Sequence, residues 1–289
     1  MIEKKYINFH GLHMLFKSCD DFNRFCGRSI MDYQQYSDLF YGTDSSVYIP
    51  LWASVAKTDD DILLNHVTLD VIKFYKAYGY SPIYMDGNPA DFIGEQFRFL
   101  EYISACGLNG TMGKKECSDT IEQFEQKFLT DTVHMVITAL SKYDAPSFVI
   151  TLLEKALSGD YYEWLSDSDF IKAHNLKESD HDLIFIKSFD SYNIKKKPSL
   201  PVEHPKKISI ASSCDCGSKC KMIATVCEGC LLQIEPDSHG TPIRFSGCPR
   251  GRAYGRTYLT SKRLRYPMER IGNRGDGKFK RISWEEAAE

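Results

Sequence analysis

Six cysteines crowd into one short stretch of this sequence: Cys214, Cys216, Cys220, Cys227, Cys230 and Cys248. One residue separates Cys214 from Cys216, three separate Cys216 from Cys220, and 27 separate Cys220 from Cys248. A cubane iron–sulfur cluster needs four converging thiolates, and several close cysteines with a distant fourth can supply them. The spacing therefore favours a 4Fe-4S cluster on Cys214, Cys216, Cys220 and Cys248.

Zinc is the competing metal. Cys227 and Cys230 form a two-residue-spaced pair of the kind found in zinc knuckles, and they can combine with Cys216 and Cys220 or with Cys248. Residues 1–10 lack the pattern of a secretory signal, so we expect reduced thiols and not disulfides. Six cysteines without any metal remain the third interpretation.

The cysteines lie in a region of strand and loop character. Two short runs have β character: Met222–Val226 and Leu231–Ile234. The four residues between them, Cys227-Glu-Gly-Cys230, suit a hairpin turn. The stretch from Cys248 to the end is basic and rich in glycine. Its last residues, from Ser283, have the pattern of a helix start, from which we expect a truncated chain.

The first 190 residues show a different sequence pattern. Apolar residues at spacings of three and four predict helices that begin near Thr58–Asp61 and near Asn88–Asp91, and others over 133–140 and 148–156. Six histidines of this region, among them His10 and His13, stand in no ligand motif, and we expect them to be solvated or core residues. We predict a mainly α protein: an all-helical bundle followed by a small hairpin and loop segment.

Charge and composition divide the chain in two. Residues 1–200 carry a net charge of −9 and residues 201–289 a net charge of +6. Between them, 195–207 contains three prolines and five lysines, which favours an extended linker. The predicted domains are 1–195, a linker at 196–210, and a metal-binding segment at 211–289.

Four motifs of the C-terminal segment resemble a known family. They are Cys248-Pro-Arg-Gly251, Arg263-Leu-Arg-Tyr-Pro-Met-Glu-Arg270, Gly272-Asn-Arg-Gly-Asp-Gly-Lys278 and Ile282-Ser-Trp-Glu-Glu-Ala287. Together they look like the N-terminal iron–sulfur segment of the dimethyl sulfoxide reductase family of molybdopterin oxidoreductases, over about residues 210–289.

The resemblance implies roles for single residues. Cys216, Cys220 and Cys248 would be cluster ligands, and Arg250 would lie between the cluster and a pterin, where it favours electron transfer. Cys214 departs from the family, which has two or three residues between its first two cysteines. Cys227 and Cys230 match no family ligand, so they are free thiols, a replacement for Cys214, or a second metal site.

The same resemblance limits the expected activity. The family's molybdenum bis-pterin guanine dinucleotide is held by further domains that this sequence lacks, so we expect that cofactor only in a longer form. The chain alone is not expected to turn over substrate. An electron-transfer subunit is an expected partner of the longer form.

The helical region resembles the redox-enzyme maturation chaperones over about residues 10–185. The resemblance rests on Leu39–Tyr48, on Asn88-Pro89-Ala90-Asp91 and on Glu95–Tyr102. Such chaperones are all-helical and cytoplasmic, and they bind an apo-molybdoenzyme until its cofactor is inserted. The family's Glu-Pro-x-Asp-His reads Asn88-Pro89-Ala90-Asp91-Phe92 here, which puts the role of that loop in question.

The combined hypothesis is a maturation chaperone fused to the 4Fe-4S segment of an oxidoreductase. Its client would be an apo-molybdoenzyme or its own C-terminal tail, in the cytoplasm and without membrane insertion. The alternative is a helical binding protein with a zinc-stabilised basic C-terminal module. Nucleic acid is not favoured as its partner, because few aromatic residues lie among the cations. A third interpretation leaves the C-terminal fragment unfolded.

Overall fold

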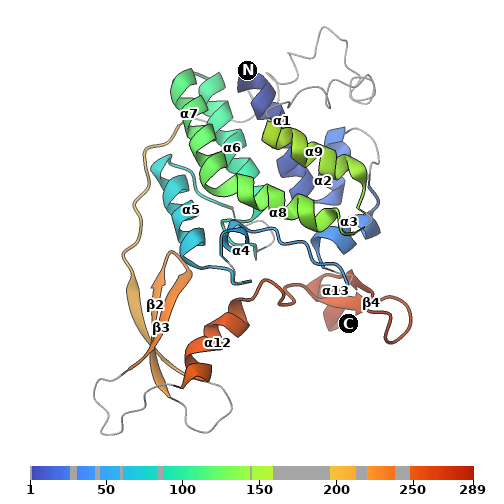
Figure 1. Cartoon of the computed structure of the whole chain (residues 1–289), viewed down its shortest axis with the longest axis vertical. Coiled ribbons are helices and arrows are strands. Elements are labelled where there is room, and N and C mark those ends of the chain that lie inside the picture. Colours follow the sequence, from blue (N-terminus) through green and yellow to red (C-terminus); the bar gives the residue numbers. More distant parts are fainter. Residues whose placement is uncertain are drawn as a thin grey trace.

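A computed structural model describes residues 2–26, 31–42, 46–58, 61–83, 87–143, 145–158, 196–212, 220–237 and 248–289. Its N-terminal part is a bundle of helices that occupies the upper half of Figure 1. The helices of this part are α1 (Ile2–Lys17), α2 (Cys19–Cys26), α3 (Tyr33–Phe40), α4 (Ala53–Ala56), α5 (His66–Ala77), α6 (Ile93–Leu108), α7 (Lys114–Phe124), the π-helical turn η2 (Glu125–Leu129), α8 (Thr130–Leu140) and α9 (Ser147–Ser158). The prediction of a helical N-terminal part is confirmed.

Helix α6 is the central element of this body. It is buried along nearly its whole length, and α1 packs along it. Aromatic rings fill the space between α5, α6 and α7: the ring centroids of Tyr75 and Phe99 lie 4.7 Å apart, and those of Phe99 and Phe124 lie 4.8 Å apart. Aromatic pairs at such distances add to the stabilisation from burial alone.

Two of the predicted helix starts are wrong by several residues. Helix α5 begins at His66, where the side chain of Asn65 accepts a hydrogen bond from the amide of Val67 at 2.8 Å. Helix α6 begins at Ile93 and not near Asn88. The predictions over 133–140 and 148–156 agree with α8 and α9.

The residues after position 195 first run along the helical body and then form a sheet. Residues 196–205 are extended, and β1 (Lys206–Ala211), β2 (Lys221–Cys227) and β3 (Cys230–Pro236) make an antiparallel sheet in the order β1-β2-β3. The predicted linker at 196–210 therefore ends in a strand. The predicted hairpin is present, with Cys227 opposite Cys230.

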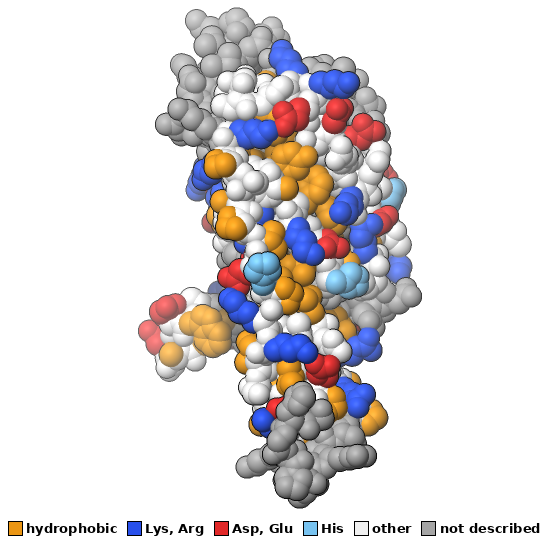
Figure 2. All heavy atoms as spheres, turned by 90° about the vertical axis from the view of Figure 1, so that its left-hand side faces the viewer, with side chains coloured by type: hydrophobic (Ala, Val, Ile, Leu, Met, Phe, Trp, Pro, Cys, Tyr) orange, Lys and Arg blue, Asp and Glu red, His pale blue; other side chains and the backbone are white. Residues whose placement is uncertain are grey.

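The extended segment is anchored on the body. The amide of Lys197 donates to the hydroxyl of Tyr102 at 3.2 Å, and the amide of Leu200 donates to the carbonyl of Lys76 at 2.7 Å. Figure 2 views the left-hand side of Figure 1, where hydrophobic side chains run down the molecule between charged ones. Because the body holds this segment, the sheet has a defined place below α5.

The last described stretch returns to the body. Helix α12 (Pro249–Leu259) rises from the lower end of the sheet, and strands β4 (Met268–Arg270) and β5 (Phe279–Arg281) with α13 (Trp284–Ala288) lie beneath α3 (Figure 1). Strands β4 and β5 pair antiparallel, with Met268 opposite Arg281. Within the described ranges, no helix is long and apolar enough to cross a bilayer.

Candidate functional site: contacts between the helical body and the C-terminal segment

The C-terminal segment joins the helical body through its backbone. The amide of Leu63 donates to the carbonyl of Leu259 at 2.8 Å, and the amide of Ser261 donates to the carbonyl of Asp61 at 2.7 Å. Ile62 and Thr260 form an isolated antiparallel bridge between these bonds. Residues 259–261 thus pair with the loop before α5 as a short added strand would.

Arg265 is the central side chain of the contact. Its guanidinium lies 4.4 Å from the ring centroid of Trp52, and it donates a hydrogen bond to the side-chain oxygen of Asn88. Trp52 and Asn88 are both buried, at 3% and 5% exposure. A guanidinium over an indole face combines cation–π attraction with stacking, which lysine cannot reproduce.

Arg281 makes a second contact of the same kind. Its guanidinium lies 3.7 Å from the ring centroid of Tyr266 and 4.4 Å from that of Tyr41. The two tyrosine rings are 5.6 Å apart. The body therefore contributes Tyr41 and Trp52 to contacts with two arginines of the C-terminal segment.

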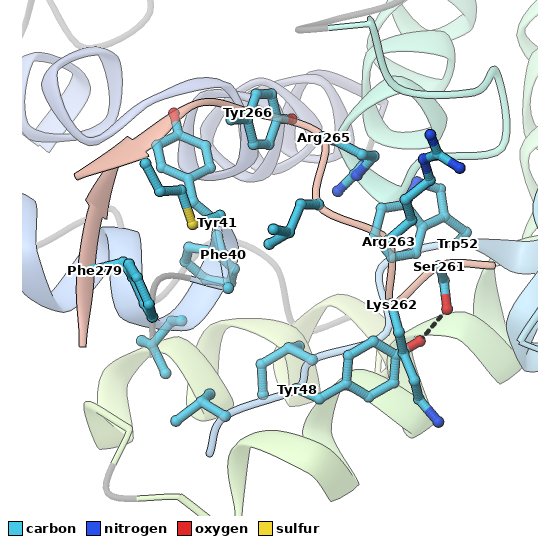
Figure 3. A pocket seen from close by; sticks show the side chains of 16 residues that line it. Phe40, Tyr41, Tyr48, Trp52, Ser261, Lys262, Arg263, Arg265, Tyr266 and Phe279 are labelled. Atoms are coloured by element: carbon cyan, nitrogen blue, oxygen red, sulfur yellow. Dashed lines mark hydrogen bonds between the residues drawn. The ribbon is translucent and has the colours of Figure 1, made fainter. Parts of the chain in front are cut away.

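A pocket of about 430 Å³ lies between the two parts (Figure 3). One wall comes from residues 39–42 and 47–52 of the body, and the other comes from residues 261–268 with Phe279. At its rim the hydroxyls of Tyr48 and Ser261 are hydrogen-bonded, and the ammonium of Lys262 lies 5.3 Å from the ring centroid of Tyr48. The pocket is part of the contact, because both segments line it.

The predicted loop Asn88-Pro89-Asp91 is buried at this contact. Asn88 faces Arg265, as described, whereas Asp91 points into the body. One carboxylate oxygen of Asp91 accepts from the amide of Ser54 at 2.7 Å, and the other accepts from the hydroxyl of Thr68 at 2.9 Å. Burial raises the pKa of Asp91, although these hydrogen bonds oppose the shift. Asp91 thus fixes the start of α4 and does not cap α6.

The predicted cluster ligands are described only in part. Cys214 and Cys216 lie outside the described residues. Cys220 directly precedes β2, and Cys248 is the N-cap of α12, where its Sγ accepts from the amide of Gly251 at 3.4 Å. Cys220 therefore stands at the end of β2 away from the turn, and α12 begins near the same end of the sheet (Figure 1).

The other predicted site residues of this segment are Arg250, which is exposed, and Cys227 and Cys230, which are buried. Arg250 is exposed in the first turn of α12, two residues after Cys248. Cys227 and Cys230 are buried at the opposite end of the hairpin, and burial is the main cause that raises the pKa of Cys230 to about 12. A thiol that keeps its proton is a poor metal ligand, so this environment favours a free thiol at Cys230.

The hairpin turn is held on α5 by an ion pair. The ammonium of Lys76 lies 2.6 Å from a carboxylate oxygen of Glu228, which also accepts from the amide of Glu203. Glu228 and Gly229 both have positive φ, of 50° and 76°, as the mirror-image hairpin turn requires. The buried Cys227 and Cys230 flank this turn.

One polar cluster was missed from the sequence. The Nδ1 atoms of His10 and His13 on α1 each lie 2.9 Å from one carboxylate oxygen of Glu101 on α6. The three-residue spacing of the histidines puts them on one face of a helix, which sequence can indicate. Their partner stands 88 and 91 residues away, and no local pattern connects it to them.

Comparison with known proteins finds one matching family model and several similar curated proteins. Residues 33–134 match the nitrate reductase delta subunit family. This range lies within the stretch for which the sequence resembles maturation chaperones, and it contains Tyr41, Trp52 and Asn88. The match supports a chaperone-like region for molybdoenzymes in the helical body.

The curated relatives are reductases and a dehydrogenase subunit. Dimethyl sulfoxide reductase DmsA of Haemophilus influenzae is 43% identical over 82 residues, which are 27% of this chain and 10% of that protein. DmsA of Escherichia coli is 40% identical over 96 residues, or 31% of this chain and 12% of that protein. Dimethylsulfide dehydrogenase subunit alpha of Rhodovulum sulfidophilum is 46% identical over 57 residues, or 20% and 6%. The chain thus spans about a tenth of the first two relatives. No solved structure matches it.

Proposed function

We propose that the helical body is a maturation chaperone of dimethyl sulfoxide reductase-type molybdoenzymes, and that it holds the adjoining C-terminal segment as a client in cis. The observation that carries this proposal is the contact of Arg265 with Trp52 and Asn88. Both body residues lie in the range that matches the delta subunit family. Arg265 belongs to a motif by which the C-terminal segment resembles the reductases.

The charges of the two parts suit such binding. The body is acidic and the C-terminal segment is basic, and arginines supply the principal cations of the contact. Opposite charge speeds the encounter of partners and fixes their orientation. Because 196–205 connects the two parts, the segment is presented at high effective concentration and needs only modest intrinsic affinity.

The C-terminal segment is proposed to bind a 4Fe-4S cluster through Cys214, Cys216, Cys220 and Cys248. The two described cysteines support this role: Cys220 directly precedes β2, at the end of that strand away from the turn, and Cys248 is the N-cap of α12, which begins near that end of the sheet (Figure 1). Such a cluster supplies one-electron transfer, and Arg250 places a cation next to it. Molybdenum bis-pterin guanine dinucleotide would be held by a longer form.

The binding part of the proposal is tested with a fluorescent peptide of residues 256–283. The receptor is the full chain with Arg265→Ala and Arg281→Ala, which weaken the contact in cis. We expect saturable binding of the peptide, and loss of binding when Tyr41→Ala is added. Tyr33→Ala, at a 46% exposed tyrosine on α3, is the matched control. Equal peptide affinity for both tyrosine variants would overturn the assigned site.

The chaperone part is tested by coexpression with an apo-reductase subunit of the dimethyl sulfoxide type. The intact chain should raise the molybdenum content of the purified subunit, and the Tyr41→Ala chain should do so less. A molybdenum content that is independent of the chain would refute the chaperone role. Anaerobic reconstitution with iron and sulfide, followed by metal analysis, tests the cluster: bound iron supports it, whereas zinc or no metal contradicts it.

A further inference from the structure

Three side chains of ligand type meet between α1 and α6. The possible ligand atoms of His10, His13 and Glu101 all lie within 4.8 Å of one another. His13 and Glu101 are buried, at 6% and 5% exposure, whereas the side chain of His10 is 21% exposed. The cluster is therefore enclosed by the body and reached from the side of His10.

The carboxylate of Glu101 is enclosed, and each of its oxygens faces an imidazole nitrogen at 2.9 Å. A buried charged carboxylate needs a cation beside it, since an uncompensated charge in the interior is costly. A metal ion between the three side chains would supply that cation.

We propose that His10, His13 and Glu101 bind a divalent transition-metal ion of the zinc class. Two imidazole nitrogens and one carboxylate are a donor set that zinc accepts, with bonds of about 2.0 to 2.2 Å. At such bond lengths, tetrahedral ligand atoms lie roughly 3.3 Å apart. The two nitrogen–oxygen distances of 2.9 Å are shorter than this, and all the ligand atoms lie within 4.8 Å of one another, so an ion requires local adjustment of these side chains. Three protein ligands leave the fourth position to water.

The position of the site gives the ion a structural role. His13 Nε2 has no hydrogen-bond partner in the part of the chain that the structure describes, so the ring is anchored through Nδ1 alone. A metal bond at Nδ1 would fix both rings to Glu101 and thereby clamp α1 onto the central helix. The ion would displace protons from the imidazoles, so its affinity rises with pH.

The test uses the full chain with Cys214, Cys216, Cys220 and Cys248 replaced by serine, which removes the proposed cluster thiolates. Zinc is titrated against a chromophoric chelator, and thermal unfolding is followed with zinc and with chelator. We expect one zinc ion per chain and a higher Tm with zinc. Substitution by cobalt should give a spectrum of nitrogen and oxygen ligands without a thiolate charge-transfer band.

Variants separate this site from others. His10→Gln and Glu101→Gln each remove a direct ligand, so each should weaken zinc binding by more than the ~100-fold that loss of an outer-shell partner can cost. His134→Gln, at an exposed histidine of α8, is the matched control and should bind normally. His10 is partly exposed, so its variant is expected to fold, and circular dichroism checks this. Absence of zinc binding by the parent chain, or equal binding by His10→Gln and His134→Gln, would overturn the proposal. Neither result bears on the chaperone role.

Discussion

Replacement of Arg265 by alanine should open the contact between the C-terminal segment and the helical body. The change removes a cation–π contact of about 1 kcal/mol and a hydrogen bond from a charged donor of about 1.5 to 3 kcal/mol. It also leaves the buried oxygen of Asn88 without this donor. Because such contributions are not additive, we expect a loss of about 2 kcal/mol, or roughly 30-fold in the ratio of docked to undocked segment.

Hydrogen–deuterium exchange measures this ratio at two amides. The amides of Leu63 and Ser261 are bonded across the contact, to Leu259 and Asp61, so they exchange when the segment undocks. In the Arg265→Ala chain their protection should fall by roughly 30-fold. Amides inside α6 should keep their protection, since the body stays folded.

The control is Arg274→Ala, which removes an exposed arginine of the same segment. It changes the net charge equally but should leave the protection of Leu63 and Ser261 within about twofold. Unchanged protection in Arg265→Ala, or an equal fall in Arg274→Ala, would refute the claim that the stacked arginine holds the segment.

Three further predictions concern the cysteines, the buried carboxylate and pH. Cys248→Ser should abolish iron binding on anaerobic reconstitution, whereas Cys230→Ser should retain it, as measured by iron content; the reverse result would reassign the ligands. Asp91→Asn can accept only one of the two hydrogen bonds that Asp91 accepts, so the free energy of unfolding in urea should fall by about 2 kcal/mol, and an unchanged midpoint would contradict this. Burial opposes the lowered pKa of Glu228, but the amide of Glu203 and the ammonium of Lys76 outweigh it, so this carboxylate stabilises the folded state above its unfolded pKa of about 4.3. That contribution is lost as the pH falls below this value through the lower folded pKa, so Glu228→Gln should flatten the stability curve below about pH 4.3 and leave its slope near neutral pH unchanged; identical curves below pH 4.3 would exclude it.

Local sequence patterns were sufficient to predict those helices and turns whose structure depends mainly on their own residues. Apolar spacing placed α8 and α9, and the glycine of Cys227-Glu-Gly-Cys230 placed the hairpin turn. The start of α6 was predicted near Asn88 because proline suits a first helical turn, but the helix begins at Ile93. The intervening loop is held instead by Asp91, whose two oxygens accept hydrogen bonds from Ser54 and Thr68, 37 and 23 residues away. Tertiary hydrogen bonds thus overrode a local signal.

The contact between Asn88 and Arg265 also forms between residues that are far apart in the sequence. The sequence marked the loop around Asn88 and the motif around Arg265 separately, each through its own resemblance. Nothing in either motif indicated that the two side chains meet across 177 positions. The histidine cluster was missed for the same reason, because Glu101 joins His10 only after α1 and α6 have packed.

The orientation of the hairpin separates its contact with α5 from the proposed cluster ligands. Strands β2 and β3 have seven residues each and are about 20 Å long. The turn that packs on α5 is therefore far from the opposite end of the hairpin, where Cys220 lies and near which α12 begins with Cys248. The proposed cluster, with Cys220 and Cys248 among its ligands, would therefore lie away from the turn that is docked on α5.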